Sequence, residues 1–420
     1  MANILSKCFG FDSTQHSVRT EILAGLTTFL TMAYILAVNP GIFSALDMPG
    51  GAVFTATALA AIVGTLVMAL YAKKPFALAP GMGLNAFFVY TVCIGMGHSW
   101  QFALTAVFIE GLLFIILTLT KVRTWLINAI PGTLKKAIGA GIGLFIAFIG
   151  MQNAGIIADN PATLVSLGDI THGKALVGII GLFIKDPASG EAVTQLIRNE
   201  AGNVKLISLP DSISPIFCKF EWASILSWDM LAVVFTFLFI DMFDTMGTII
   251  GVHQSSGLIQ KGGDEIPGVE KMFLADSIAT VAGACFGTST TTTYVESASG
   301  VGEGGRTGLT AFSTAVFFVL ALFFSPIFLA IPGAATAPAL IIVGVMMMGS
   351  VKNIHWEDYC KAIPAFVTLI MMPLAYSISD GILLGVISYV LCHAVAGKFK
   401  EISITMWILA ALFVCKYIFI

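Results

Sequence analysis

The sequence predicts an all-α protein that crosses a membrane many times, and its composition, its apolar segments and the distribution of its basic residues all support this. Of the 420 residues, 57% are hydrophobic and 11% are charged, whereas a soluble domain carries about 25% charged residues. The mean hydropathy is +0.93. A soluble chain of this composition would expose large apolar patches, which favour aggregation. A lipid bilayer is therefore the solvent that suits this chain.

Apolar segments that can form membrane helices follow one another along the whole chain. A span needs about 20 mainly apolar residues, so this length holds about a dozen, short or broken ones included. Proline and glycine interrupt some segments, as at residues 80–83 and 300–302. The last segment either spans or lies at the interface. The segments cover residues 21–44, 52–71, 83–96, 100–120, 132–157, 227–253, 268–286, 308–331, 334–350, 363–378, 381–396 and 403–420.

The basic residues predict which ends of the spans face the cytoplasm. If the N-terminus is cytoplasmic and the spans alternate, 15 of the 21 basic residues fall on the inner side, as the positive-inside rule requires. Five of the other six lie in one atypical segment, residues 171–222, where only residues 175–184 are apolar. We therefore expect a multi-pass protein of the cell membrane with a cytoplasmic N-terminus and a water-exposed stretch at residues 185–220.

Two parts of the chain echo one another weakly. Residues 132–153 and 338–353 are both apolar, glycine-containing segments that end in asparagine. Each half also has a break in its third helix, near residues 80–85 and 288–300. Paired interruptions of this kind point to the binding site of a transporter, although apolar, glycine-rich segments also resemble one another by chance.

Two acids, Asp241 and Asp244, lie within one predicted span. An acid in the middle of a span costs about 2.5–3.5 kcal/mol on insertion scales, so it needs a partner or a function. Three residues apart on a helix, the two side chains lie near one face and cannot both ionise cheaply at low dielectric. The pair therefore suits a site that binds and releases a proton. The alternative is a purely structural pair, capped by neighbouring hydroxyls or helix N-termini.

Glu296 follows a run of threonine and serine residues at 288–293. This run is rich in β-branched side chains, which favour an extended stretch over a helix. Extended backbone at membrane depth is tolerated only where it lines a cavity or is buried in protein. A carboxylate at its end can accept two N–H donors from one edge of a planar ring. We therefore expect Glu296 to bind a small planar solute, and the alternative is that it lies at the edge of a polar extracellular loop.

Three further polar residues lie in apolar surroundings. Asn85 follows the helix-breaking residues 80–83, and its amide offers both donors and acceptors. It therefore fits a binding site and a helix–helix contact equally well. Asp276 lies near a predicted helix start, where it can orient another group. Glu110 is better explained by packing or by a hydrogen bond between helices.

Other kinds of chemistry find no support in the sequence. The six histidines and seven cysteines show no metal-ligand spacing, and no Walker, nucleophile-elbow or zinc motif is present. We therefore expect no enzyme activity, no metal and no cofactor. A net charge of −3 gives no reason to expect a nucleic-acid partner.

Four segments resemble the AzgA-like adenine/guanine/hypoxanthine permeases of the nucleobase:cation symporter family. They are residues 25–34, 80–88, 239–248 and 286–300, and the match covers most of the chain in the family's order. The resemblance implies two inverted seven-helix repeats, arranged as core and gate domains, with short extended stretches in the broken third and tenth helices. It also implies proton-coupled uptake of purine nucleobases, and the raised pKa expected for an acid within a span favours the proton over sodium as coupling ion.

The resemblance also assigns roles to residues by their position in the motifs. Asp244 resembles the substrate acid of the eighth helix, Glu296 the acid of the tenth helix that binds the purine edge, and Asn85 the polar residue of the broken third helix. Asp276 resembles the ninth-helix acid that supports the site. With their neighbours, the expected substrate-binding residues are Asp244, Glu296, Asn85, Thr293 and Tyr294, and the expected proton-coupling or supporting residues are Asp241, Asp276 and Thr248.

The chain departs from the family where the sixth and seventh helices are expected, and this sets its predicted division. Residues 1–157 hold spans 1–5 as the first repeat, residues 158–222 replace spans 6 and 7, residues 223–402 hold spans 8–14, and residues 403–420 form a C-terminal apolar helix. Spans 1–4 and 8–11 form the core domain, and the rest form the gate domain. Loss of both helices keeps the orientation of every later span, in agreement with the basic residues.

Three functions stay open on the sequence alone. The first is proton-coupled purine uptake, whose partners are a purine nucleobase, a proton and the lipid bilayer. The second is purine binding without transport, because an altered gate puts alternating access in question. The third is anion transport by the same architecture, which would prefer a basic or neutral site to Asp244 and Glu296. The sequence does not rank the purines, and it leaves a homodimer open.

Overall fold

The computed structural model describes most of the chain. The predicted replacement of the sixth and seventh helices covers residues 158–222, and its central part, residues 168–206, lies outside the described residues, as does most of the predicted segment 334–350. The described residues are 2–120, 131–153, 155–160, 163–167, 207–256, 268–329, 341, 344–345, 347–375 and 378–419.

Helices make up nearly all of the described regular structure, as the sequence predicts. In the first half, the elements are α1 (Ala2–Phe9), α2 (Val18–Met32), α3 (Ile35–Phe43), η1 (Ser44–Leu46), α4 (Gly50–Val67), η2 (Met68–Ala72), β1 (Leu78–Pro80), α5 (Met82–Ala86), η3 (Phe87–Gly95), α6 (Trp100–Leu119), α8 (Gly132–Asn153), β2 (Ile157–Asn160) and β3 (Leu164–Leu167). In the second half, they are α11 (Trp228–Ser256), α12 (Val269–Phe286), β4 (Thr291–Thr293), α13 (Ser297–Gly302), α14 (Gly308–Ala321), η4 (Leu322–Phe324), α15 (Ser325–Leu329), η5 (Gly349–Asn353), α17 (Tyr359–Leu374), α18 (Ile378–Val395), η6 (Phe399–Glu401) and α19 (Ile404–Phe419).

Local sequence signals set where several of these helices begin. The Ser99 hydroxyl accepts a hydrogen bond from the Phe102 amide at the start of α6. Thr307 caps α14 and Asp358 caps α17 in the same way. Because the first amides of a helix have no partner within it, such side chains stabilise the helix start, typically by about 1 kcal/mol. Short polar residues therefore mark the ends of otherwise apolar helices.

Several helices of the described part are long and apolar enough to cross a membrane. Large apolar side chains lie exposed on their outer faces, for example Leu119 at 68% and Val395 at 89% exposure. Such faces are unfavourable in water and suit contact with lipid. Five candidate spans are found among the described residues, at Val18–Leu46, Gly50–Ala72, Trp100–Leu119, Gly132–Gln152 and Gly308–Leu329, and shorter apolar helices cover Met82–Gly95, Tyr359–Leu374 and Asp380–Val395.

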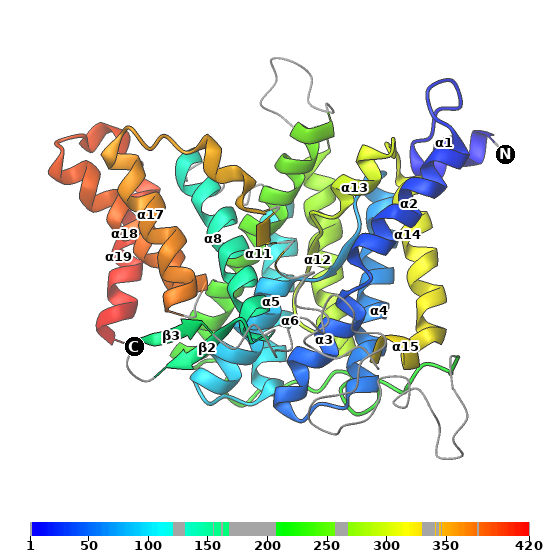
Figure 1. The fold of residues 1–420 in the computed structure, drawn as a ribbon, viewed down its shortest axis with the longest axis horizontal. Coiled ribbons are helices and arrows are strands. Elements are labelled where there is room, and N and C mark those ends of the chain that lie inside the picture. Colours follow the sequence, from blue (N-terminus) through cyan, green and yellow to red (C-terminus); the bar gives the residue numbers. More distant parts are fainter. Residues whose placement is uncertain are drawn as a thin grey trace.

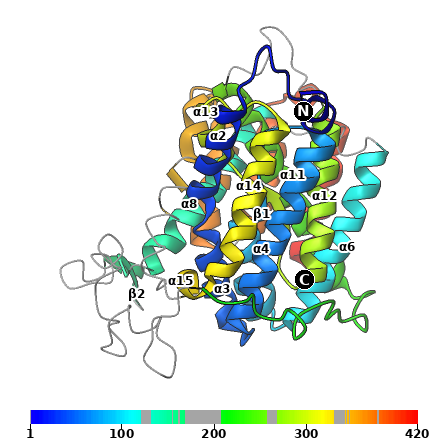
Figure 2. The ribbon, with the colours of Figure 1, turned by 90° about the vertical axis from the view of Figure 1, so that its right-hand side faces the viewer.

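The helices gather into two groups, which Figure 1 shows side by side. On the left, α8 packs against α17, and α17 packs against α18, which in turn contacts α19. On the right, α14 packs against α2 and α4, and α12 packs against α4 and α6. Figure 2, turned by 90°, looks onto this second group, in which α2, α4 and α14 lie next to one another. Helix α11 contacts members of both groups.

Two short strands from opposite halves of the chain pair inside the helical bundle. β1 and β4 are antiparallel, with Leu78 opposite Thr293 and Pro80 opposite Thr291. The amide of Gly81 extends the pairing by donating to the Thr290 carbonyl at 3.0 Å. All residues of both strands are buried. Because lipid offers no hydrogen bonds, extended backbone at this depth needs such a partner, and each strand supplies it to the other.

A second strand pair lies at the edge of the molecule. β2 and β3 form an antiparallel hairpin, with Ile157 opposite Leu167, at the lower left of Figure 1. The hairpin follows α8 and occupies the start of the segment 158–222, for which the sequence predicts no strand. Most of its residues are partly or fully exposed, so it belongs to the surface and not to the paired strands at the centre.

Glycines allow α2 to lie between α13 and α14 at very short range. A Cβ atom added to Gly300 of α13 would lie 2.5 Å from the Ala24 carbonyl oxygen of α2. One added to Gly25 of α2 would lie 2.6 Å from the Thr310 carbonyl oxygen of α14. Small residues at such contacts let membrane helices approach closely. The position of α13 relative to α2 therefore depends on the missing side chain of Gly300.

A buried acid, Glu21, reinforces this contact at the start of α2. Its carboxylate accepts hydrogen bonds from the amides of Arg306 and Thr307, at 3.1 and 3.2 Å, and from the Thr310 hydroxyl. Glu21 is only 1% exposed. A carboxylate that accepts amide and hydroxyl hydrogen bonds is well compensated for its burial, so Glu21 holds α2 to the first turn of α14.

We predict that Gly300→Ala destabilises the protein, because the added methyl group overlaps the backbone of α2. Overpacking of this kind typically costs about 1–3 kcal/mol. The measurement is the apparent Tm of the purified protein in detergent, which should fall. Gly302→Ala is the matched control on the same helix, because nothing lies within 4 Å of a Cβ atom at that position. Equal Tm values for the two variants would contradict the close contact.

Candidate substrate site

Two short helices begin at the paired strands: α5 contains the predicted site residue Asn85, and α13 begins at the predicted site residue Glu296. Gly81 follows β1 and is the N-cap of α5, and Glu296 follows β4 and is the N-cap of α13. Proline and glycine end the extended stretch before α5, whereas the small residues of α13 permit a helix directly after Glu296. The strand pair therefore brings Gly81 and Glu296, from opposite halves of the chain, into one region.

Glu296 is held by a tyrosine from the first apolar span. The Tyr34 hydroxyl donates to Glu296 Oε1 at 2.6 Å. Tyr34 lies in the turn between α2 and α3, and Glu296 is 3% exposed. Among the described residues, the only other hydrogen bond to the Glu296 side chain comes from the backbone of Glu296 itself, so the carboxylate keeps acceptor sites for a ligand.

Asp244 is the second carboxylate with free acceptor capacity. It projects from the middle of α11 and is partly exposed, and it lies within electrostatic range of Glu296 and Asp276. A Cβ atom added to Gly81 would lie 3.6 Å from Asp244 Oδ2, so the carboxylate faces the start of α5. Within the described part of the chain, Asp244 accepts no hydrogen bond. An acid in this position needs a partner, and a ligand can supply it.

The other two acids of this region belong to a buried hydroxyl network. The Thr245 hydroxyl donates to Asp276 Oδ1 at 2.8 Å, lies 3.3 Å from Asp241 Oδ1 and lies 2.7 Å from the Thr292 hydroxyl of β4. The Thr293 hydroxyl also reaches Asp276, at 3.5 Å. Asp241 and Asp276 are fully buried. Asp241 and Asp244 therefore differ in surroundings although they are only three residues apart. Asp241 belongs to a buried hydrogen-bond network, whereas Asp244 is partly exposed and accepts no hydrogen bond from the described residues.

Asn85 and Glu110 anchor the residues that precede β4. Asn85 Oδ1 accepts a hydrogen bond from the Ser289 hydroxyl, and Glu110 Oε2 accepts one from the Thr290 hydroxyl at 2.7 Å. All four side chains are fully buried. The sequence predicts packing or a hydrogen bond between helices for Glu110, and its observed partner, Thr290, lies instead in the segment just before β4. Asn85 lies on α5, one turn after Gly81, and its hydrogen bond links the first half of the chain to the residues before β4 in the second half.

The remaining predicted residues surround the same strand pair. The Tyr294 hydroxyl donates to the Pro80 carbonyl oxygen at 2.5 Å, so in this structure Tyr294 braces β4 against β1. Thr248 is buried on α11, one turn beyond Asp244. The eight predicted site residues thus come from α5, α11, α12 and the segment around β4, and the structure brings these elements together.

Two residues of this region were not singled out from the sequence. Tyr34 belongs to the segment 25–34 that carries the family resemblance, yet nothing in its local sequence indicates a contact with Glu296, 262 residues away. Thr245 directly follows Asp244, and a hydroxyl beside two acids is a usable signal for a hydrogen-bonded network. The first contact needs the tertiary fold, whereas the second could have been found.

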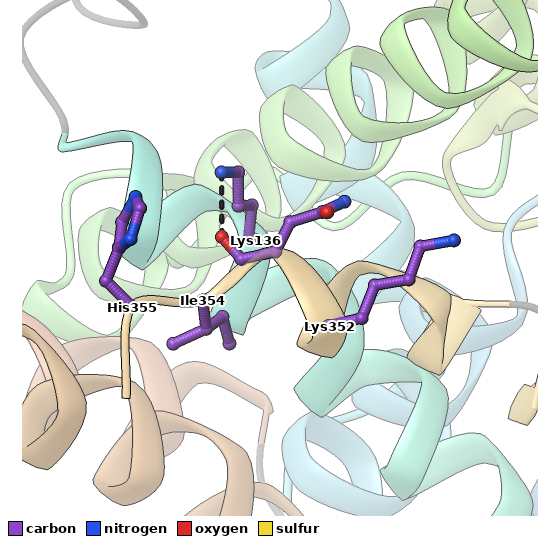
Figure 3. Close-up of a pocket in the computed structure, with 5 residues that line it drawn as sticks. Lys136, Lys352, Ile354 and His355 are labelled. Atoms are coloured by element: carbon purple, nitrogen blue, oxygen red, sulfur yellow. Dashed lines mark hydrogen bonds between the residues drawn. The ribbon is translucent and has the colours of Figure 1, made fainter. Parts of the chain in front are cut away.

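A separate cavity of about 500 Å³ opens at one end of α8. Figure 3 shows its lining residues, among which Lys136 Nζ donates to the Asn353 carbonyl oxygen at 2.9 Å. Lys352, Ile354 and His355 complete the lining. None of the predicted site residues lines it, and its basic character does not suit a neutral planar solute. The candidate substrate site is therefore the region around the strand pair.

Comparison with known proteins decides the family. A model of the permease family matches residues 19–185 and 176–384. The chain belongs to this permease family. It is 41% identical to the adenine permease AdeQ of Escherichia coli, over 99% of this chain and 96% of that one. It is 46% identical to the guanine/hypoxanthine permease PbuG of Bacillus subtilis, over 98% of this chain and 99% of that one. The resemblance to AzgA-like purine permeases is confirmed.

Solved structures with the same fold support the predicted architecture of this permease. The transmembrane domain of the cyanobacterium bicarbonate transporter BicA matches with a TM-score of 0.61 at 16% identity, covering 88% of this chain and 97% of that one. Murine Solute Carrier 26 family member A9, an anion transporter, matches with a TM-score of 0.62 at 12% identity, covering 91% of this chain and 69% of that one. At such low identity the likeness concerns the fold alone. The fold class predicted from the sequence is confirmed.

These matches also confirm the broad functional class. A permease is a transporter and not an enzyme, as the sequence predicts, and the apolar helices agree with a multi-pass membrane protein. The family match extends over both halves of the chain, including the segments that carry Asp244 and Glu296.

We predict that Thr245→Val destabilises the permease, because it removes the hydroxyl that links Asp276 to Thr292. Leaving buried polar groups without a partner costs about 1–3 kcal/mol. The apparent Tm in detergent should fall for Thr245→Val and recover in Thr245→Ser, which restores the hydroxyl. Thr120→Val, on an exposed residue at the end of α6, is the control and should leave Tm unchanged. A Thr245→Ser protein as unstable as Thr245→Val would argue against the hydroxyl network.

Proposed function

We propose that this permease takes up purine nucleobases, namely adenine, guanine and hypoxanthine, together with protons. The carrying observation is the pair of carboxylates beside the strand pair, Asp244 and Glu296, which keep free acceptor oxygens while the neighbouring acids are tied into the protein. Relatives named as adenine and guanine/hypoxanthine permeases, at 41% and 46% identity over nearly the whole chain, support this choice of substrate.

The chemistry of the two carboxylates suits a purine better than an anion. Purine rings carry N–H groups at their edges, and a carboxylate accepts such donors at favourable geometry. An anion would be repelled by both carboxylates, and at low dielectric this repulsion is large. Although the fold is shared with a bicarbonate transporter, we do not expect the substrate to be shared, because two acids beside the strand pair disfavour an anion.

Proton coupling follows from the cost of two charges in a confined region. Asp244 and Glu296 lie close enough to interact electrostatically, and two like charges in a low-dielectric site are costly unless one is neutralised. A proton neutralises one carboxylate, and its release on the other side of the membrane resets the site. Sodium is the less favoured coupling ion. The buried pair Asp241 and Asp276, joined through Thr245, is the proposed support of this proton exchange.

Transport further requires that the site face the two sides of the membrane in turn. We propose that spans 1–4 and 8–11 form a core that carries the site, and that the remaining spans form a gate against which the core moves. In the structure β1, β4 and α13 lie with α2, α4, α12 and α14, whereas α11 also contacts α8 and α18 of the other group (Figure 1). The atypical segment 158–222 belongs to the proposed gate, so binding without transport is the outcome to test against.

We predict that purified permease in proteoliposomes accumulates radiolabelled adenine, guanine or hypoxanthine and that an inward proton gradient stimulates this uptake. Asp244→Asn and Glu296→Gln should each lower uptake by at least about 10-fold, the loss expected for one hydrogen bond to a charged group. Glu303→Gln is the matched control, because Glu303 is an exposed acid just after α13 and should leave uptake unchanged.

The same vesicles distinguish the alternatives. Purine binding at equilibrium without uptake would show a binder that does not transport. Uptake driven by a sodium gradient and insensitive to pH would replace the proton as coupling ion. Bicarbonate or sulfate flux with no effect of purines would refute the proposed substrate.

We also propose that the N-terminus is cytoplasmic in the cell membrane, and we predict the sidedness of two exposed positions. In a chain whose native cysteines have been replaced, Ala45→Cys should react with a membrane-impermeant maleimide in intact cells. Lys400→Cys should react only after the cells are permeabilised. Both positions are exposed in the structure, so a difference in labelling reports the side of the membrane. The opposite pattern would invert the proposed orientation.

A further inference from the structure

We propose that Tyr34 is a positioning residue of the substrate site, whose phenol fixes the Glu296 carboxylate so that its remaining acceptor sites face the purine. This inference rests on the proposed function and deepens it, since it assigns a role to a residue of the first span that neither the sequence motifs nor the family comparison provides.

The geometry of the contact is that of a strong hydrogen bond. The Tyr34 hydroxyl lies 2.6 Å from Glu296 Oε1, and hydrogen bonds to an ionised acceptor are both shorter and stronger than neutral ones. A glutamate side chain has several rotatable bonds, and a buried one that binds a ligand loses affinity if it must first be ordered. The phenol fixes one carboxylate oxygen, and acceptor sites remain for the ligand because the two oxygens offer about four lone-pair sites.

Tyr34 can hold Glu296 because its own backbone is fixed. Its carbonyl oxygen accepts hydrogen bonds from the amides of Ala37 and Val38, at 3.0 and 2.9 Å, and so starts α3. Ile35 and Leu36, which follow it, are fully buried. A tyrosine ring has few torsions of its own, so a donor on this backbone is well defined in space.

The packing of α2 also fixes the other end of the contact. Gly300 of α13 lies against the Ala24 carbonyl and the Thr28 hydroxyl of α2. Glu296 is the N-cap of that same helix, one turn before Gly300, and Tyr34 follows α2 directly. The two hydrogen-bonding partners are thus carried by elements in backbone contact. The distance between them is set by the fold and not by the side chains alone.

A phenol at this place has two other conceivable roles, and each makes a different prediction. If Tyr34 itself bound the purine, its loss would weaken binding whether or not residue 296 were an acid. If it only stabilised the fold, its loss would lower Tm and leave the affinity of the folded protein unchanged. A positioning role predicts an effect on affinity that depends on the Glu296 carboxylate, which is what a double-mutant cycle measures.

The test uses the full-length permease with Tyr34→Phe, Glu296→Gln and the double variant. Purine binding is measured at equilibrium in detergent with radiolabelled adenine, guanine and hypoxanthine. The KM and kcat of uptake are measured in proteoliposomes, and the apparent Tm is measured for each protein. Tyr71→Phe is the matched control, because Tyr71 lies on η2 outside the site, is 46% exposed and has the Lys271 ammonium over its ring. It should leave the affinity unchanged.

For Tyr34→Phe we expect a Kd that is 10- to 100-fold higher, the range for one hydrogen bond to a charged group. We also expect a raised KM, a kcat within about twofold of that of the unaltered permease and an unchanged Tm. In the Glu296→Gln background the same change should alter Kd by less than about twofold. Equal weakening in both backgrounds, an affinity unaltered by Tyr34→Phe, or a loss explained by a fallen Tm would each overturn the positioning role. If the unaltered permease binds no purine, the proposed function itself is refuted.

Discussion

The structure depends on one constraint: backbone that is not helical must find hydrogen bonds inside the bundle, because lipid provides none. β1 and β4 supply hydrogen bonds to each other, with Pro80 opposite Thr291, inside the helical bundle. Each strand then starts a new short helix, at Gly81 and at Glu296. The candidate site exists because the two interruptions meet, since neither half alone could leave its backbone extended at this depth.

Hydrogen bonding divides the acids around the strand pair into two classes. Asp276 accepts from the Thr293 hydroxyl of β4 and from Thr245 of α11. Glu110 accepts from Thr290, just before β4, and so both acids hold this segment. Asp244 and Glu296 keep free oxygens. Burial alone would not separate these groups, because Glu296 is nearly as buried as Asp276. The distinction between support and binding therefore comes from which oxygens are already in use.

Much of the fold could be predicted from the sequence, because composition and apolar segment length follow directly from the solvent. The broken helices were also predictable, since Pro80 and the threonine run before Tyr294 disfavour helix. The pairing of the two extended stretches was not, because strand register depends on tertiary contacts that local sequence does not encode. The hairpin formed by β2 and β3 was missed for the same reason.

The site was predictable in its acids and less so in their partners. An acid inside an apolar segment is conspicuous, so Asp244 and Glu296 stand out without any structure. A tyrosine in an apolar segment is unremarkable, because Tyr is compatible with core, interface and site alike. Tyr34 became meaningful only when the fold placed its hydroxyl on Glu296. Long-range hydrogen bonds between ordinary residues are what sequence reasoning misses here.

The strand pair also has a consequence for how the protein is made. Tyr294 and Pro80, which it joins, lie 214 residues apart in the chain, and contacts of such separation form late because a long loop must close first. During synthesis, β1 therefore leaves the ribosome and enters the membrane well before β4 exists. Until then its backbone groups need another partner, such as water at the insertion machinery or a helper protein. The backbone of β1 in the first half of this permease therefore needs temporary hydrogen-bond partners until the second half has been synthesised.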